Sequence, residues 1–322
     1  MKPLPFLLSP PDLSTLRQGN TGTEGVWHFA SGRPGRHVMI SALIHGNELC
    51  GAWALKGLLD AELRPARGRL TLVLANLAAF DLFDPLLHDK SRFVDEDMNR
   101  QWADDRITDL RTVERQRVAS LAPWVRQADW LLDLHSMHEP GAPLLLTGTQ
   151  ARNLQLAREL ASPVHIVVDA GHKDGVRMRD YDRFGQADKE APDTRSLLIE
   201  CGFHGDLASL DVARDISVRF LERSGIVDES TLQALLKTWK QADAPEQWAL
   251  RVTGAVVARS EGFRFTKPYR SLECIARAGT VIGDNDGEPV TTPYDDCVLV
   301  MPSIRQARAG VTVVRFALRA RL

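Results

Sequence analysis

The stretch from His37 to Glu48 has the sequence HVMISALIHGNE, and the fold is decided there. Its first eight residues are nearly all apolar, which predicts a strand buried on both faces of a parallel or mixed sheet. Residues 49–59 then place apolar side chains at helical spacing. His45 and Glu48 therefore lie at the carboxyl end of a predicted central strand, where both side chains can reach one metal ion.

Outward from this stretch, buried strands alternate with helices. A second buried strand is predicted at 69–76, so that strand, helix and strand form a βαβ-type unit. Such units favour an α/β sheet with helices on its faces. Further strands are predicted at 25–30, 130–136, 144–147, 164–168 and 196–202, and helices at 109–127, 150–161, 207–224 and 231–237.

Three parts of the chain depart from this alternation. Residues 79–106 and 169–195 are charged and lack clear periodicity, and irregular segments of such length are more often functional than decorative. From residue 247 onward, alternating β-type runs are broken by Gly, Pro, Asn and Asp. We therefore predict two domains, a catalytic domain at 1–243 and a small, mostly antiparallel β domain at 244–322.

The composition argues against several classes of protein. The 322 residues suffice for one large and one smaller domain, and 40 basic against 42 acidic side chains leave a net charge of −2. This balance suggests neither a nucleic-acid nor a membrane partner. The four cysteines form no CxxC pair, so a cysteine zinc site and a disulfide framework are not expected. Without a signal sequence or a bilayer-spanning run, the cytoplasm is the expected location.

A third metal ligand is predicted where a second buried strand ends. His135 closes the apolar run 130–134. Catalytic zinc sites commonly have three protein ligands and one position open for water. Two histidines and one carboxylate suit zinc well, so His45, Glu48 and His135 predict one Zn²⁺ per chain.

Two neighbours of this third ligand have open roles. Asp133 shares a strand face with His135, because side chains alternate along a strand. It either orients the ligand or makes a structural hydrogen bond. His138 is expected on the surface of the loop that follows, and the alternative is that it supports a ligand or forms part of the site.

Candidates for the remaining chemistry lie at another strand end and in the irregular segment. Glu200 ends the apolar run 197–199 and could serve as the base that takes a proton from water. The alternative is a structural role, in which the carboxylate at the end of the strand has all its hydrogen bonds made by the protein. Arg92, Asn99 and Arg100 lie within 79–106, and an arginine fork suits a substrate carboxylate, although a solvated surface charge is the alternative.

Four motifs in fixed order carry a family resemblance. They are His45-Gly46-Asn47-Glu48, Asp97-Met98-Asn99-Arg100, Asp133-Leu134-His135-Ser136 and Leu198-Ile199-Glu200-Cys201-Gly202. In this order the chain resembles the succinylglutamate desuccinylase/aspartoacylase family, whose fold belongs with the zinc carboxypeptidases. The resemblance spans roughly residues 37–205, and the β-rich tail resembles the family's second domain in kind. It implies a zinc-carboxypeptidase-like mixed sheet flanked by helices, with a small C-terminal β domain.

The resemblance also implies roles for single residues. His45, Glu48 and His135 match the zinc ligands, and Glu200 matches the catalytic base. Arg92 matches the arginine that polarises the scissile carbonyl. Asn99 and Arg100 match the pair that grips a substrate carboxylate.

These residues together predict a zinc-dependent amidohydrolase. Its substrate would be an N-acyl amino acid or a similar small carboxylated amide, cleaved by zinc-activated water. Two alternatives stay open: a zinc carboxypeptidase acting on a peptide or peptidoglycan fragment, and a non-catalytic protein that kept a metal pocket. Assembly into a homo-oligomer is also left open.

Overall fold

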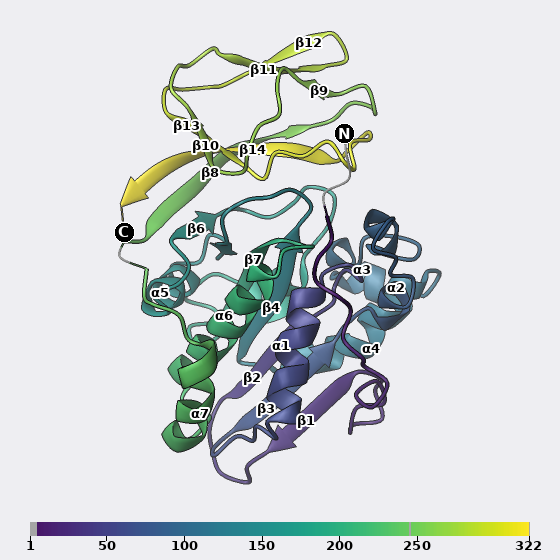
Figure 1. The fold of residues 1–322 in the computed structure, drawn as a ribbon, viewed down its shortest axis with the longest axis vertical. Coiled ribbons are helices and arrows are strands. Elements are labelled where there is room, and N and C mark those ends of the chain that lie inside the picture. The colour runs from purple at the N-terminus through teal and green to yellow at the C-terminus, as the bar shows by residue number, and fades with distance from the viewer. Residues whose placement is uncertain (1–4, 245, 322) are drawn as a thin grey trace.

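The computed structural model describes residues 5–244 and 246–321, and within them one 11-stranded sheet runs through the molecule (Figure 1). Its strand order is β1-β3-β2-β4-β7-β5-β6-β8-β14-β13-β10. The strands are β1 (Val26–Ala30), β2 (His37–Ala42), β3 (Arg69–Leu74), β4 (Trp130–Met137), β5 (Leu144–Leu146), β6 (His165–Val168), β7 (Arg195–Phe203), β8 (Trp248–Val257), β10 (Glu273–Ile275), β13 (Cys297–Val300) and β14 (Thr312–Arg321). A three-stranded sheet is formed by β9 (Arg264–Phe265), β11 (Val281–Asn285) and β12 (Glu288–Thr291).

Helices cover both faces of the central strands. They are α1 (Leu49–Asp60), α2 (Leu77–Phe80), α3 (Asp104–Ile107), α4 (Val113–Gln127), α5 (Ala151–Glu159), α6 (Ala208–Ser224) and α7 (Glu229–Trp239). Short 3-10 helices are η1 (His88–Ser91), η2 (Met98–Arg100), η3 (Met178–Asp180) and η4 (Asp182–Phe184). All but α2, α3 and the 3-10 turns were predicted, and these short elements occupy the two irregular segments or their edges.

The alternation of β2 explains why its sequence is apolar throughout. Val38 and Ile40 join the hydrophobic cluster of α1 and α6, whereas Met39 joins the cluster of α4. β2 pairs in parallel with β3 and β4, β4 pairs in parallel with β7, and β5 runs antiparallel to β7. The predicted α/β class, a mixed sheet flanked by helices, is confirmed.

The β-rich C-terminal region continues this sheet. β8 pairs in parallel with β6, and from there β8, β14, β13 and β10 pair in antiparallel fashion. Figure 1 shows the smaller sheet of β9, β11 and β12 at the far end of this region. The predicted antiparallel β character is confirmed, while the boundary between 243 and 244 stays a prediction.

None of the helices among the described residues combines the length and the apolar character that crossing a membrane would require.

The first residue of β2 makes stability depend on pH. His37 is fully buried, with Nδ1 3.0 Å from the carbonyl oxygen of Gln127 and Nε2 2.7 Å from Oγ1 of Thr71. Burial lowers the pKa of His37 from 6.5 to about 4. The folded protein thus keeps His37 neutral at a pH where the unfolded chain binds a proton, so its contribution is complete above pH 6.5 and is lost as the pH falls toward 4.

We therefore expect the free energy of unfolding to fall by about 2 kcal/mol between pH 7 and pH 5 on account of His37. Urea unfolding of the wild type and of His37→Gln at both pH values measures this. The variant should lose this share of the pH dependence. An equal change in the free energy of unfolding between pH 7 and pH 5 in the two proteins would contradict the prediction.

Candidate active site

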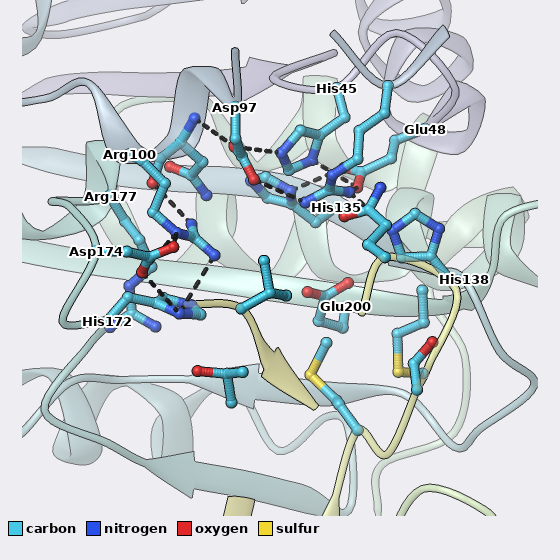
Figure 2. A pocket seen from close by; sticks show the side chains of 18 of the residues that line it. His45, Glu48, Asp97, Arg100, His135, His138, His172, Asp174, Arg177 and Glu200 are labelled. Atoms are coloured by element: carbon cyan, nitrogen blue, oxygen red, sulfur yellow. Dashed lines mark hydrogen bonds and ion pairs between the residues drawn. The ribbon is translucent and has the colours of Figure 1, made fainter. Parts of the chain in front are cut away.

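The predicted site residues meet because three strands are neighbours in the sheet. His45 and Glu48 follow β2, His135 lies in β4, and Glu200 lies in β7, directly opposite His135 in the register of the two parallel strands. The order β2-β4-β7 brings the carboxyl ends of these strands to one edge. Figure 2 shows the four side chains around a common space.

The turn after β2 has a special backbone. Leu43 adopts a left-handed φ of 59°, which is unfavourable for a non-glycine residue, and it is fully buried. Three residues later Gly46 lies against α2, where a Cβ would come within 2.3 Å of the carbonyl carbon of Ala79. Any larger residue at 46 would therefore displace the turn that aims His45 and Glu48.

The three predicted metal ligands converge. Nδ1 of His45 lies 2.8 Å from Oε1 of Glu48, and Nδ1 of His135 lies 2.8 Å from Oε2. One donor atom from each residue lies within 4.8 Å of the other two, and all three side chains are buried. Across residues 5–244 and 246–321, no other group of His, Cys, Asp and Glu meets these conditions.

The contact between Glu48 and His135 lacks hydrogen-bond geometry. Oε2 of Glu48 is buried and has no hydrogen-bond partner among the described residues, despite the nearby ring nitrogen. A buried acceptor left without a partner is costly. A cation between these atoms would satisfy both, so the residues fit a divalent metal with nitrogen and oxygen ligands.

The outward nitrogen of each histidine is held by a second carboxylate. Nε2 of His45 lies 2.9 Å from Oδ1 of Asp97, and Nε2 of His135 lies 2.8 Å from Oδ2 of Asp133. Such carboxylates fix the tautomer and orientation of a metal-binding histidine. Asp133 thus has the geometry of an orienting residue. Asp97 had no predicted role, although it opens one of the four motifs.

The electrostatics of the group favour a positive charge at its centre. Although burial raises the pKa of Glu48, the rings of His135 and His45 hold it well below its usual value. Burial lowers the pKa of His135, but Asp133 and Glu48 together hold it well above its usual value. Because only a neutral imidazole binds a metal, metal binding would displace a proton here and weaken in acid.

We expect Asp133→Asn to weaken zinc binding about 10- to 100-fold, because the amide stabilises the outward N–H of His135 less than a carboxylate does. A competition titration against a zinc-binding dye measures the affinity. Asp211→Asn, at an exposed position on α6, is the matched control. Equal affinities of Asp133→Asn and the control would contradict an orienting role.

Asp97 also connects the three predicted metal ligands, His45, Glu48 and His135 (the metal group), with two predicted functional residues. Its Oδ1 accepts a hydrogen bond from the backbone N–H of Asn99 at 2.9 Å, and its Oδ2 accepts one from Arg92 at 3.2 Å. Burial raises the pKa of Asp97, but His45 and Arg92 hold it well below its usual value. Asp97 therefore stays ionised and fixes the spacing between the metal group and the arginine.

The loop that carries Asp97 is held by α4. Glu114 is fully buried, and its carboxylate accepts hydrogen bonds from the backbone N–H groups of Val94, Asp95 and Glu96 and from Nδ2 of Asn76. A segment without regular secondary structure thus has its backbone donors satisfied by one side chain.

Arg92 is fixed from two sides at the edge of the metal group. One guanidinium nitrogen lies 3.5 Å from Oε1 of Glu48 and donates to Nε2 of His138 at 3.2 Å, while the other donates to Asp97. His138 presents that lone pair because its Nδ1 is 3.0 Å from a carboxylate oxygen of Asp89. His138 thus lies in the wall of the site, and the prediction of a loop-surface position is wrong.

Glu200 has the properties of an acid or base. It is 8% exposed, and its Oε2 is buried without a hydrogen-bond partner among the described residues. Burial and the charge of Glu48 raise the pKa of Glu200 to about 8. A cation bound by Glu48 would neutralise the charge of that carboxylate and so lower the pKa of Glu200 again. The alternative of a satisfied strand-terminal carboxylate therefore lacks support.

Asn99 and Arg100 lie beside the metal group, and both already form hydrogen bonds with other groups of the protein. Oδ1 of Asn99 accepts a hydrogen bond from the backbone of Met178, which leaves the amide nitrogen for a ligand. Arg100 donates to Asp174 at 3.2 Å, to the carbonyl of Asn99 at 2.9 Å and to His172 at 3.2 Å.

One cavity of about 350 Å³ contains all seven predicted site residues. Figure 2 shows Arg100, His172 and Arg177 to one side of Glu200 and His138 to the other. The C-terminal region closes part of it with Ser271, Met301, Ser303, Gln306, Thr312 and Arg315. Its volume lies near the lower end of the range for small-molecule sites.

Comparison with known proteins agrees with the motif order. Residues 34–188 match the family model described as the succinylglutamate desuccinylase/aspartoacylase catalytic domain. No curated protein sequence matches the chain significantly.

Solved structures match over most of the chain. The succinylglutamate desuccinylase from Vibrio cholerae is 16% identical with a TM-score of 0.69, covering 92% of this chain and 86% of that chain. The Vibrio parahaemolyticus enzyme is 15% identical with a TM-score of 0.66, covering 92% and 87%. The product-bound ectoine utilization protein EutE (DoeB) from Ruegeria pomeroyi is 17% identical with a TM-score of 0.60, covering 89% and 86%.

At these identities the solved structures establish the fold alone, whereas the family model matches the sequence of residues 34–188, just under half of the chain. The matched segment contains the metal group, Asp97 to Arg100 and Asp133 to Ser136. Residues 34–188 therefore match the succinylglutamate desuccinylase/aspartoacylase catalytic domain, and the chain shares the fold of solved structures that carry this family's name.

Proposed function

We propose that this protein is a zinc-dependent hydrolase that cleaves the amide bond of an N-acyl amino acid or a similar small carboxylated amide. One observation carries the proposal. The buried His45-Glu48-His135 group, a carboxyl with a free oxygen and an arginine share one small cavity. The names of the matched family and of its solved relatives, which denote deacylating enzymes, support this chemistry.

The positions of the side chains suggest a role for each residue in the reaction. A divalent cation, when bound, would lower the pKa of a water molecule and polarise a carbonyl. Glu200 takes a proton from the attacking water and passes it to the leaving nitrogen. Arg92 stabilises the negative charge that develops on the carbonyl oxygen. Asn99 and Arg100 contribute to the cationic end of the cavity, where a substrate carboxylate would lie.

The enclosure of the cavity favours a small substrate over a long peptide. Arg305 of the C-terminal region lies 2.7 Å from Glu139, which lines the cavity, and 3.4 Å from Asp89, which binds His138 in the cavity wall. These ion pairs hold that region against the site. A carboxypeptidase acting on an extended chain would need an open groove at this position.

The test is a hydrolysis screen with zinc-loaded protein. N-acyl amino acids, short peptides and peptidoglycan fragments are assayed in parallel, with and without a chelator, and the zinc content is measured. Chelator-sensitive release of free amino acids only from N-acyl amino acids, at one zinc per chain, is expected. Turnover of peptides alone would favour the carboxypeptidase, and tight zinc binding without any turnover would favour a binding protein.

A further inference from the structure

The last strand places a buried arginine in the wall of the active-site cavity. Arg315 of β14 is 7% exposed and lines the cavity. It donates one hydrogen bond to the ring of His172, with its NH2 nitrogen 3.1 Å from Nδ1. Among residues 5–244 and 246–321, no carboxylate forms an ion pair with it.

The other arginines at this end have counter-charges. Arg177 donates to both carboxylate oxygens of Asp169, each at 2.9 Å, and to Asp180. Arg100 donates to Asp174. These partners neutralise the two guanidinium groups and use up much of their donor capacity.

Arg315 keeps donors that the protein does not use. Its Nε and its second terminal nitrogen have no hydrogen-bond partner among the described residues. Neither atom is fully buried, so a ligand in the cavity can reach both. Burying a guanidinium without a counter-charge is costly. This cost is visible in Arg315, because burial lowers its pKa and the charge of Asp169, which pairs with Arg177, offsets this effect only in part. A bound carboxylate would satisfy the free donors and supply the missing charge.

His172 explains why the two arginines coexist. Nδ1 of His172 lies 3.2 Å from a guanidinium nitrogen of Arg100 and 3.1 Å from one of Arg315, so a single acceptor nitrogen faces both guanidinium groups and the ring lies between them. Burial and the charges of Arg315 and Arg100 hold the pKa of His172 well below its usual value. A neutral imidazole in this position separates two cations that would otherwise repel each other directly.

We propose that Arg315 is the principal anchor of the substrate carboxylate, with Arg100 held by Asp174 as a supporting residue. This inference rests on the proposed function and sharpens it, since it makes the C-terminal region a part of the substrate site. The anchor is also absent from the four motifs, all of which end before residue 203.

The test compares a hydrolysed N-acyl amino acid with its carboxamide, which lacks the negative charge. In the wild type, kcat/KM for the acid is expected to exceed that for the amide roughly 10- to 100-fold. In Arg315→Met this preference disappears, because KM for the acid rises while kcat changes little. Arg315→Lys retains part of it. Arg319→Met, at an exposed position four residues further along β14, keeps the full preference.

A structural role of Arg315 predicts a different result. If Arg315→Met slows acid and amide equally, or keeps the wild-type preference, the inference is overturned. Thermal unfolding identifies a variant that does not fold, in which case Arg315→Gln replaces it.

Failure of the proposed function is recognised separately. If the wild type hydrolyses no N-acyl amino acid, calorimetric titration with succinate still tests the anchor. Weaker binding to Arg315→Met than to Arg319→Met supports the inference, and equal or absent binding in both contradicts it.

Discussion

Glu200→Gln is expected to lower kcat roughly 10²- to 10⁴-fold while zinc binding stays intact. Glutamine has nearly the same shape as glutamate, so the cavity keeps its volume. It cannot take a proton from water, and this is the step for which the free oxygen of Glu200 is positioned. The side chain belongs to β7, whose backbone is fixed by pairing with β4 and β5, so the substitution should not disturb the fold.

The pH dependence gives a second readout of the same residue. A base must be ionised to act, so kcat of the wild type should fall as the pH drops below the pKa of Glu200. That pKa is raised to about 8 by burial and Glu48, and a cation on Glu48 should bring it down. The acidic limb of the profile should be absent in Glu200→Gln.

Steady-state assays at several pH values and zinc analysis of the purified variant measure these effects. Glu190→Gln, an exposed position with the same chemical change, is the control. Near-normal turnover by Glu200→Gln at one zinc per chain would remove Glu200 from the mechanism. Loss of zinc together with activity would mean that Glu200 supports the metal group instead.

The metal group could be predicted from sequence because its positions depend on strand order alone. Two buried apolar runs, 37–44 and 130–134, each end in a histidine. Parallel strands present their carboxyl ends at one edge of a sheet, so neighbouring strands suffice to bring His45, Glu48 and His135 together.

The residues that the sequence did not reveal depend on tertiary contacts between distant segments. Asp97 reaches His45 only because Glu114, on a separate helix, holds the intervening loop. His138 lies in the cavity wall because Asp89 binds it there. Arg315 occurs in an alternating β pattern, where a charged residue normally faces solvent. It is buried because β14 packs against a cavity that is lined mainly by residues between His45 and Glu200.

Arg92→Met is expected to lower kcat roughly 100- to 1,000-fold, which is the usual cost of removing one donor that stabilises a developing oxyanion. Arg92 lies 3.5 Å from a carboxylate oxygen of Glu48, one of the proposed metal ligands, and is hydrogen-bonded to Asp97 and His138. Its charge is therefore in place before the reaction and needs no reorganisation during it. Methionine keeps an unbranched side chain but removes both the charge and the donors.

The measurement separates this role from substrate binding. If Arg92 acts on the oxyanion, kcat falls for every N-acyl amino acid and for its carboxamide alike, whereas loss of a carboxylate anchor raises KM for the acid alone. Arg92→Lys should recover only part of the rate, because its single ammonium cannot keep the contacts to Asp97 and His138 together. Arg111→Met, with a side chain that is 72% exposed, controls for the loss of a positive charge. A normal kcat with a raised KM in Arg92→Met would move Arg92 from the reacting carbonyl to substrate binding.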